Sequence, residues 1–195
     1  MQQTQQKKAL VPIAQSFEEI EAVTIIDVLR RAGVDVTVAS IMGKSHSLAI
    51  KGSNGITIVC DNHLQDVIDQ DFDLISLPGG MPGAQHLSDC QILIEKLKKQ
   101  QQQDKYLSAI CAAPAIVLQK HGFLNDQVAG TAHPSIQDKL TNKSLINDDL
   151  NVAITGKIIT SKGPGTAIEF TLELINKLFN QKKALEIAKK LVFKK

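Results

Sequence analysis

The sequence predicts an α/β protein whose mostly parallel sheet is covered by helices on both faces. Two observations carry this prediction. Apolar stretches of strand length alternate with stretches of helical periodicity, and the strand stretches are apolar almost without interruption. Strands that are apolar on both sides are typical of a parallel sheet buried between two helical layers. In such sheets, ligands bind beyond the carboxyl ends of the strands.

The expected elements follow this alternation along the chain, and turn residues mark their ends. Strands are expected at 9–13, 34–40, 48–50, 56–59, 72–77, 107–110, 152–154 and 157–160. Helices are expected from 16 to about 32, from 92 to about 99, directly after residue 111, from 134 to about 140, from 166 to about 179 and from about 182 to 191. Ser16 with Glu19, and Thr166 with Glu169, have the spacing of a capping box. The strands at 48–50 and 56–59 flank a polar turn and predict a hairpin.

Composition predicts a globular chain of domain size. The 195 residues suit a single domain, 1–195, in which residues 1–7 form a polar N-terminal tail. The net charge is only +2 and the basic residues are scattered, which argues against nucleic-acid binding. The three cysteines show neither a disulfide framework nor metal-ligand spacing, and no stretch reads as a signal peptide or membrane span. We therefore expect a cytoplasmic protein with no metal, cofactor or membrane partner.

Cys111 lies where the expected strand 107–110 turns into a helix. A helix N-terminus carries unpaired N–H groups and partial positive charge, and Pro114 fits its first turn. The arrangement matches a nucleophile elbow, in which a sharp turn between a strand and a helix exposes the reactive atom. It favours a thiolate and predicts a lowered pKa and a nucleophilic Cys111. An inert, buried cysteine remains the alternative.

Glutamates crowd the start of the first helix. Glu18 and Glu21 fall on its apolar stripe, whereas Glu19 is expected to point away. Glu18 lies in the solvated first turn, but Glu21 lies one turn deeper, where a carboxyl must be paired or stay protonated. A protonated Glu21 could donate a hydrogen bond to a thiolate. The alternative is an acid whose carboxylate reaches water.

A histidine and a glycine-rich loop complete the candidate set. His133 precedes a proline in a loop and could act as a general base or proton shuttle, although surface loop histidines are common. Gly79 and Gly80 follow a strand and could offer backbone N–H groups to a developing oxyanion, together with Ala112. Pro-Gly-Gly is also an ordinary turn.

Short motifs at these positions occur in one order along the chain. They are Glu18-Glu19-Ile20-Glu21, Leu77-Pro78-Gly79-Gly80, Ala109-Ile110-Cys111-Ala112-Ala113-Pro114, Ala132-His133-Pro134 and Ser161-Lys162-Gly163-Pro164-Gly165-Thr166. In these motifs the chain resembles the ThiJ/PfpI superfamily, from about residue 8 to residue 191. Within that superfamily it is most similar to the branch of the parkinsonism-associated protein deglycase and its bacterial relatives.

The resemblance implies a flavodoxin-like three-layer sandwich and a homodimer. It implies that Cys111 is the nucleophile and that Glu21, rather than Glu18, is the protonated acid or base that contacts the thiol. It also implies that His133 is the nearby histidine and shuttles protons. The partners so implied are small carbonyl compounds, or glycated protein and nucleotide adducts, and a second copy of the chain.

The resemblance extends to further positions and also shows departures. It implies that Gly80 and Ala112 supply the oxyanion N–H groups, and Arg31 matches a family arginine near the site and the dimer interface. Asn54 stands where family members often have an arginine, which puts the recognition of small anions in doubt. Ser135 replaces the glutamate of the His-Pro-Glu motif of class I glutamine amidotransferases, so that activity is disfavoured.

The implied function is that of a cysteine-dependent deglycase or glyoxalase-type hydrolase. It would act on glyoxal- and methylglyoxal-derived species and protect against carbonyl and oxidative stress. The alternative is a non-enzymatic redox sensor or chaperone that signals through oxidation of Cys111. A cysteine protease is disfavoured because Ala112 stands where the proteolytic branch has a histidine. A thiazole-biosynthesis role has no supporting motif.

Overall fold

The computed structural model of the protein describes residues 6–141 and 150–194. Residues 1–5 of the expected N-terminal tail, 1–7, thus lie outside the described residues. The strands are β1 (Lys8–Ile13), β2 (Asp35–Ser40), β3 (Ala49–Lys51), β4 (Thr57–Val59), β5 (Asn62–His63), β6 (Leu74–Leu77), β7 (Tyr106–Ile110), β8 (Val152–Thr155) and β9 (Ile158–Ser161). The α-helices are α1 (Glu19–Arg31), α2 (Leu64–Val67), α3 (Gly83–Asp89), α4 (Gln91–Gln102), α5 (Ala167–Leu178) and α6 (Gln181–Lys190). A π-helix, η1 (Pro114–Gln119), and two 3₁₀ turns, η2 (Pro134–Lys139) and η4 (Pro164–Thr166), complete the described elements.

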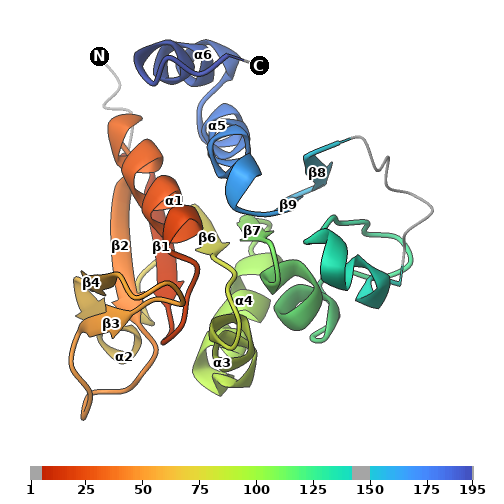
Figure 1. The fold of residues 1–195 in the computed structure, drawn as a ribbon. Coiled ribbons are helices and arrows are strands. Elements are labelled where there is room, and N and C mark those ends of the chain that lie inside the picture. Colours follow the sequence, from red (N-terminus) through yellow and green to blue (C-terminus); the bar gives the residue numbers. More distant parts are fainter. Residues whose placement is uncertain (1–5, 142–149, 195) are drawn as a thin grey trace.

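Within the described residues, seven strands form one sheet in the order β5-β2-β1-β6-β7-β9-β8 (Figure 1). Neighbouring strands are parallel, except that β8 pairs with β9 in the antiparallel sense. The prediction of a mostly parallel sheet is therefore confirmed. The predicted hairpin is also present, as the separate antiparallel pair β3 and β4. The carboxyl ends of β6 and β7 lie side by side in the middle of the sheet, because their register runs from Leu74 opposite Tyr106 to Leu77 opposite Ala109.

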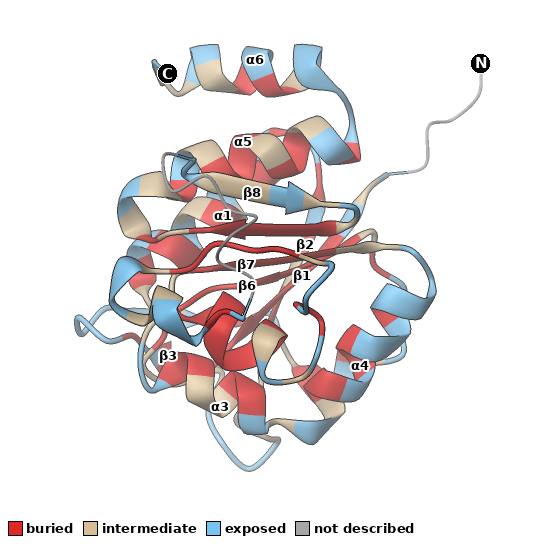
Figure 2. Ribbon diagram, turned by 90° about the vertical axis from the view of Figure 1, so that its right-hand side faces the viewer, coloured by how far each residue is buried: buried red, intermediate tan, exposed pale blue. Residues whose placement is uncertain are grey.

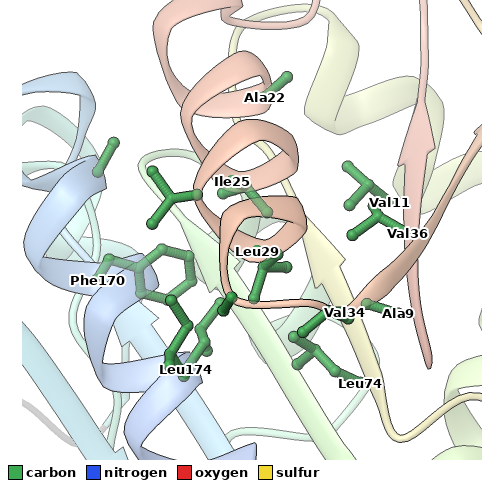
Figure 3. Packing of buried hydrophobic residues seen from close by; sticks show 14 of the residues in the cluster. Ala9, Val11, Ala22, Ile25, Leu29, Val34, Val36, Leu74, Phe170 and Leu174 are labelled. Atoms are coloured by element: carbon green, nitrogen blue, oxygen red, sulfur yellow. The ribbon is translucent and has the colours of Figure 1, made fainter. Parts of the chain in front are cut away.

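Helices cover both faces of this sheet. In Figure 2 the sheet is seen edge-on, with α1 and α5 on one side, α6 outside them, and α3 and α4 on the other side. The apolar stripe of α1 and that of α5 point at the strands and at each other (Figure 3); the side chains shown include Ala22, Ile25 and Leu29 of α1, Phe170 and Leu174 of α5, and Val11, Val36 and Leu74 of the sheet. Each fully buried leucine, isoleucine or phenylalanine contributes about 1.5–3 kcal/mol, so this contact holds α1 firmly in place. No helix in the described part of the chain has the length and apolar character that crossing a membrane requires.

The start of α1 differs from the predicted capping box. Ser16 has a φ of 62° and its backbone N–H donates to the Lys51 carbonyl at 2.9 Å. The N-terminal capping residue is Glu18 instead, whose own carboxylate accepts a hydrogen bond from the Ile20 N–H at 3.4 Å. The prediction fails because the loop before α1 is bound to the β3–β4 hairpin, which turns Ser16 away from the helix end.

The start of α5 also lacks its predicted capping box. The Thr166 hydroxyl accepts a hydrogen bond from the Gly163 N–H at 3.1 Å and donates to the Gly163 carbonyl at 2.8 Å, which closes the turn η4. The Thr166 side chain makes no capping hydrogen bond to α5, and Glu169 accepts a hydrogen bond from the Asn151 side chain at 2.8 Å. Both side chains thus tie α5 to the segments around β8 and β9.

Candidate active site

Cys111 occupies a sharp turn at the carboxyl end of β7. Its φ is 63°, a left-handed conformation that costs energy for a residue with a side chain. The Cys111 N–H donates to the Ser161 carbonyl at 3.0 Å, and the Cys111 carbonyl accepts from the His133 N–H at 2.9 Å. These bonds from two flanking segments hold the strained turn. The predicted strand-to-helix elbow is present, with Pro114 in the first turn of a π-helix.

Two glycines after β6 let the neighbouring loop approach Cys111. A Cβ added at Gly79 would lie 2.7 Å from the Cys111 Cβ and 2.9 Å from Oε2 of Glu21. Gly80 has a φ of 89°, and a Cβ there would lie 2.5 Å from the Glu18 nitrogen. A larger residue at either position would therefore force β6, β7 and the start of α1 apart.

The Glu21 side chain is fully buried between α1 and this loop. Its Oε2 accepts a hydrogen bond from the Gly79 N–H at 2.8 Å, while Oε1 has no hydrogen-bond partner among the described residues. Burial raises the pKa of Glu21 to about 7, and the negative charge of Glu18 adds to the rise; the Gly79 N–H and the Cys111 thiol oppose it. Glu21 therefore holds its proton up to near-neutral pH, the protonated state that the sequence analysis expects.

The pKa of Cys111 departs from its predicted direction. Burial is the main cause that raises it, to about 12, and the charge and hydrogen bonding of the Glu21 carboxylate raise it further. The backbone N–H groups of Gly80 and Ala112 lower it, but they do not offset the other causes. The prediction of a lowered pKa is wrong because the elbow is enclosed and lies against an acid, which outweighs the helix N-terminus.

Glu21 and Cys111 share one proton between about pH 7 and about pH 12, and it lies mainly on the sulfur because the pKa of Cys111 is the higher of the two. In one arrangement the thiol donates to a Glu21 carboxylate, which raises the pKa of Cys111 and lowers that of Glu21. In the other, the proton sits on Glu21, the carboxylate charge is gone, and the carboxyl O–H can donate to the sulfur. The Gly80 and Ala112 N–H groups favour this second arrangement because they stabilise negative charge on the sulfur.

The other two cysteines have no such neighbours. Burial, aided by the charge of Asp61, raises the pKa of Cys60 to about 12, and burial raises that of Cys90. All three cysteines are free. Across residues 6–141 and 150–194, no group of three or more His, Cys, Asp or Glu side chains is arranged to hold a metal ion.

Glu19 lies in a position that helical periodicity does not predict. Instead of pointing away, its side chain is only 3% exposed and lies against the turn of the β3–β4 hairpin. It accepts hydrogen bonds from the backbone N–H groups of Asn54 at 2.7 Å and Ile56 at 3.2 Å, and from the Asn54 side chain at 3.0 Å. Burial alone would raise the pKa of Glu19, but these donors outweigh it and lower that pKa. Glu19 is thus an ionised residue that holds the hairpin to α1.

The remaining predicted site residues lie at different distances from Cys111. His133 is brought beside it by the backbone hydrogen bond already described, and its ring nitrogen Nδ1 contacts the Ser135 hydroxyl at 2.8 Å. Arg31 lies ten residues beyond Glu21 on α1, roughly 15 Å along the helix axis. It forms an ion pair with Asp27 at 2.7 Å. Within one chain, Arg31 is therefore remote from the thiol.

The DJ-1/PfpI family model matches residues 7–177. The chain belongs to the DJ-1/PfpI family. The resemblance seen in the five motifs is thereby confirmed, and the match includes Glu21, Cys111 and His133.

Individual DJ-1 relatives cover most of the chain. Protein DJ-1 homolog A of Arabidopsis thaliana is 42% identical over 180 residues, which make up 92% of this chain and 44% of that protein. The chain thus spans less than half the length of that plant relative. The protein named glutathione-independent glyoxalase DJR-1.2 of Caenorhabditis elegans is 38% identical over 191 residues, or 97% of this chain and 98% of that protein.

Solved structures of DJ-1 proteins have the same fold. Oxidized DJ-1 of Toxoplasma gondii matches with a TM-score of 0.89 and 40% identity, over 97% of this chain and 100% of that chain. This likeness confirms the flavodoxin-like three-layer sandwich that the resemblance implies.

Proposed function

We propose that this protein is a cysteine-dependent glyoxalase or deglycase that acts on glyoxal, methylglyoxal and the adducts they form on proteins and nucleotides. The observation that carries the proposal is the buried carboxyl of Glu21, with its pKa raised to about 7, against the elbow thiol of Cys111. Family membership and the glyoxalase name of the nematode relative support it. In the cell, such an activity would serve defence against carbonyl stress, and a free nucleophilic thiol fits the reducing cytoplasm.

The proposed reaction with methylglyoxal needs no external oxidant. The Glu21 carboxylate takes the proton of the Cys111 thiol as the sulfur forms a bond to the aldehyde carbon, and Glu21 passes that proton to the carbonyl oxygen. The Glu21 carboxylate then removes the hydrogen of that carbon as a proton and returns it to the neighbouring ketone carbon, while the hydroxyl proton passes from the former aldehyde oxygen to the former ketone oxygen. The aldehyde carbon is thereby oxidised and the ketone carbon reduced. Water breaks the carbon–sulfur bond of the resulting thioester, which releases lactate and restores the thiol.

The decisive test is lactate release from methylglyoxal without glutathione. We expect turnover by the parent protein and none by Cys111→Ala. Cys90→Ala is the matched control, because Cys90 is also partly buried but lacks the Glu21 carboxyl, and it should keep parental turnover. Turnover that survives Cys111→Ala would overturn the proposed mechanism, and a parent protein without turnover would overturn the enzymatic function.

One observation favours a second function, the redox sensor. The Cys111 side chain is only partly buried, so an oxidant can reach it, and the T. gondii relative was solved in oxidized form. This function predicts that Cys111 is converted to sulfinate by peroxide before the other two cysteines, in a protein that does not turn over methylglyoxal. Peptide mass mapping after limited oxidation distinguishes the order of reaction.

We also propose that the protein acts as a homodimer through α1 and the β3–β4 hairpin. Large apolar side chains are exposed on both elements: Ile20 and Val23 are 58% and 46% exposed, and Ile56 and Val59 are 59% and 72% exposed. Buried apolar cores with charged rims are typical of dimer interfaces, and the Asp27–Arg31 pair continues the same α1 surface. Light scattering at micromolar concentration should give the dimer mass for the parent. Ile20→Glu should give the monomer, whereas the control Ile154→Glu, at the β8 edge of the sheet, should not.

A further inference from the structure

The imidazole of His133 is held on two sides. On one side, a Cβ added at Gly163 would lie 3.3 Å from the ring atom Cδ2, so the ring rests against a glycine. On the other side, the Nδ1 atom of His133 faces Ser135. The Ser135 hydroxyl lies 2.8 Å from Nδ1, and the Ser135 backbone N–H donates to Nδ1 at 3.2 Å. His133 thereby caps the turn η2 with its own side chain. These contacts fix the orientation of the ring, and the His133 backbone N–H donates to the Cys111 carbonyl at 2.9 Å.

The contact with the Ser135 backbone decides which ring nitrogen carries the proton. A backbone N–H can only donate, so Nδ1 must be an acceptor without a proton of its own. The Ser135 hydroxyl at 2.8 Å then also donates to Nδ1. In a neutral imidazole, an unprotonated Nδ1 means that Nε2 bears the hydrogen. Nε2 itself has no hydrogen-bond partner in the part of the chain that the structure describes.

We propose that Ser135 is a positioning residue that keeps His133 in the Nε2–H form, so that His133 meets a substrate oxygen as a hydrogen-bond donor rather than as a base. The proposal rests on the proposed carbonyl chemistry and refines the part of His133 in it. In this form the in-plane lone pair of the ring lies on Nδ1, where Ser135 already donates to it. Nε2 carries a hydrogen instead and cannot take up a proton. The proton exchange with sulfur and substrate then falls to Glu21, and His133 stabilises the oxygen that becomes negative. The shuttle role that the resemblance implies for His133 is replaced by this one.

The residue type at position 135 has a simple physical consequence. A glutamate there, as in the His-Pro-Glu motif of amidotransferases, would accept a hydrogen bond from Nδ1–H and leave the Nε2 lone pair free to act as a base. A serine whose backbone and hydroxyl both donate favours the opposite form. The same histidine on the same turn can therefore serve two chemistries, and the neighbour two residues later selects between them.

The tautomer can be measured directly by ¹⁵N NMR of the full chain, at a pH where the imidazole is neutral. The parent should show a protonated Nε2 and an unprotonated Nδ1 at His133. Ser135→Glu should shift the ring toward Nδ1–H and lower kcat for methylglyoxal by roughly a hundredfold, the scale of losing one oxyanion donor. Ser135→Ala keeps the backbone donor, so it should keep the Nε2–H form and lower kcat only by roughly threefold to tenfold.

Ser45 offers a matched control, because its hydroxyl contacts Nδ1 of His46 at 3.3 Å on an exposed turn. Ser45→Ala should change neither the His133 spectrum nor kcat. A parent spectrum with the proton on Nδ1, or a Ser135→Glu spectrum identical to that of the parent, would overturn the inference. Failure of the proposed function looks different: the parent would show the Nε2–H spectrum but release no lactate.

Discussion

The two sides of the first turn of α1 each bury a carboxylate, and the two carboxylates behave in opposite ways. On the hairpin side, Glu19 receives several N–H and O–H donors from residues 53–56, and its pKa is lowered. On the sheet side, Glu21 receives one backbone N–H, from Gly79, and its pKa rises to about 7. Burial is the largest cause that raises either pKa, but at Glu19 the donors outweigh it, whereas at the more deeply buried Glu21 they do not. Glu19 is thus suited to hold structure and Glu21 to exchange a proton.

The largest expected effect comes from Glu21→Gln, which keeps the shape and a donor but removes the transferable proton. We expect methylglyoxal turnover to fall by roughly a hundredfold or more, the usual scale of general acid–base catalysis. A thiol titration of the same variant should show a Cys111 that ionises more readily, because the carboxylate charge that raises its pKa is gone. Unchanged turnover would assign the acid to another residue.

The second-largest effect is expected in the pH dependence of the free energy of unfolding, to which Glu19 and Glu21 should contribute with opposite sign. The pKa of Glu21 is higher in the folded state, about 7 against the ordinary 4.5, so its contribution is fully present below about pH 4.5 and is lost as pH rises to 7. The loss should be about 3 kcal/mol, at 1.36 kcal/mol for each pKa unit. Glu19 has a lowered pKa, so its contribution is present above pH 4.5 and is lost as pH falls. Urea unfolding from about pH 2 to about pH 8 measures both, and Glu21→Gln should abolish the loss on the alkaline side.

Glu19→Ala should destabilise the fold by about 2 kcal/mol, because it removes the acceptor of the Asn54 and Ile56 N–H groups and so the bonds that hold the hairpin to α1. The expected loss is confined to stability, since Glu19 does not contact Cys111. Turnover at a temperature where the variant is folded should stay close to that of the parent. A large loss of turnover in the folded variant would contradict the division of roles between the two acids.

The smallest effect is expected for Glu18→Gln. Glu18 is partly exposed, and its charge makes the least of the contributions to the raised pKa of Glu21. Its removal should lower that pKa slightly and change turnover by less than about threefold, within the range of exposed charge interactions. If Glu18→Gln abolishes turnover while Glu21→Gln preserves it, the two acids have been assigned the wrong way round.

Much of the fold is predictable because it depends on local patterns. Continuous apolar runs predict β1, β6 and β7 to within two residues, and the apolar stripe of α1 predicts the face that meets the sheet. The elbow at Cys111 follows from the junction of a strand and a helix. The capping boxes are not predictable in this way, because the Ser16 N–H bonds to Lys51 of the distant β3–β4 hairpin and the Thr166 hydroxyl closes the turn η4 with Gly163 instead.

By itself, the sequence determined most of the strands and helices, the position of the thiol beyond the carboxyl end of a strand and the set of acids near it, since these depend on residue type and spacing alone. It did not predict β5, α2 or α3. Only the tertiary structure decided the charge of each group. The pKa of Cys111 depends on the enclosure of the elbow and on Glu21, which comes from ninety residues earlier in the chain. The ionised state of Glu19 depends on a hairpin that folds over it, and the Nε2–H form that we propose for His133 depends on the turn that brings Ser135 against Nδ1. Electrostatic effects act over a few ångströms in space, whatever the separation along the chain, and only the folded chain sets those distances.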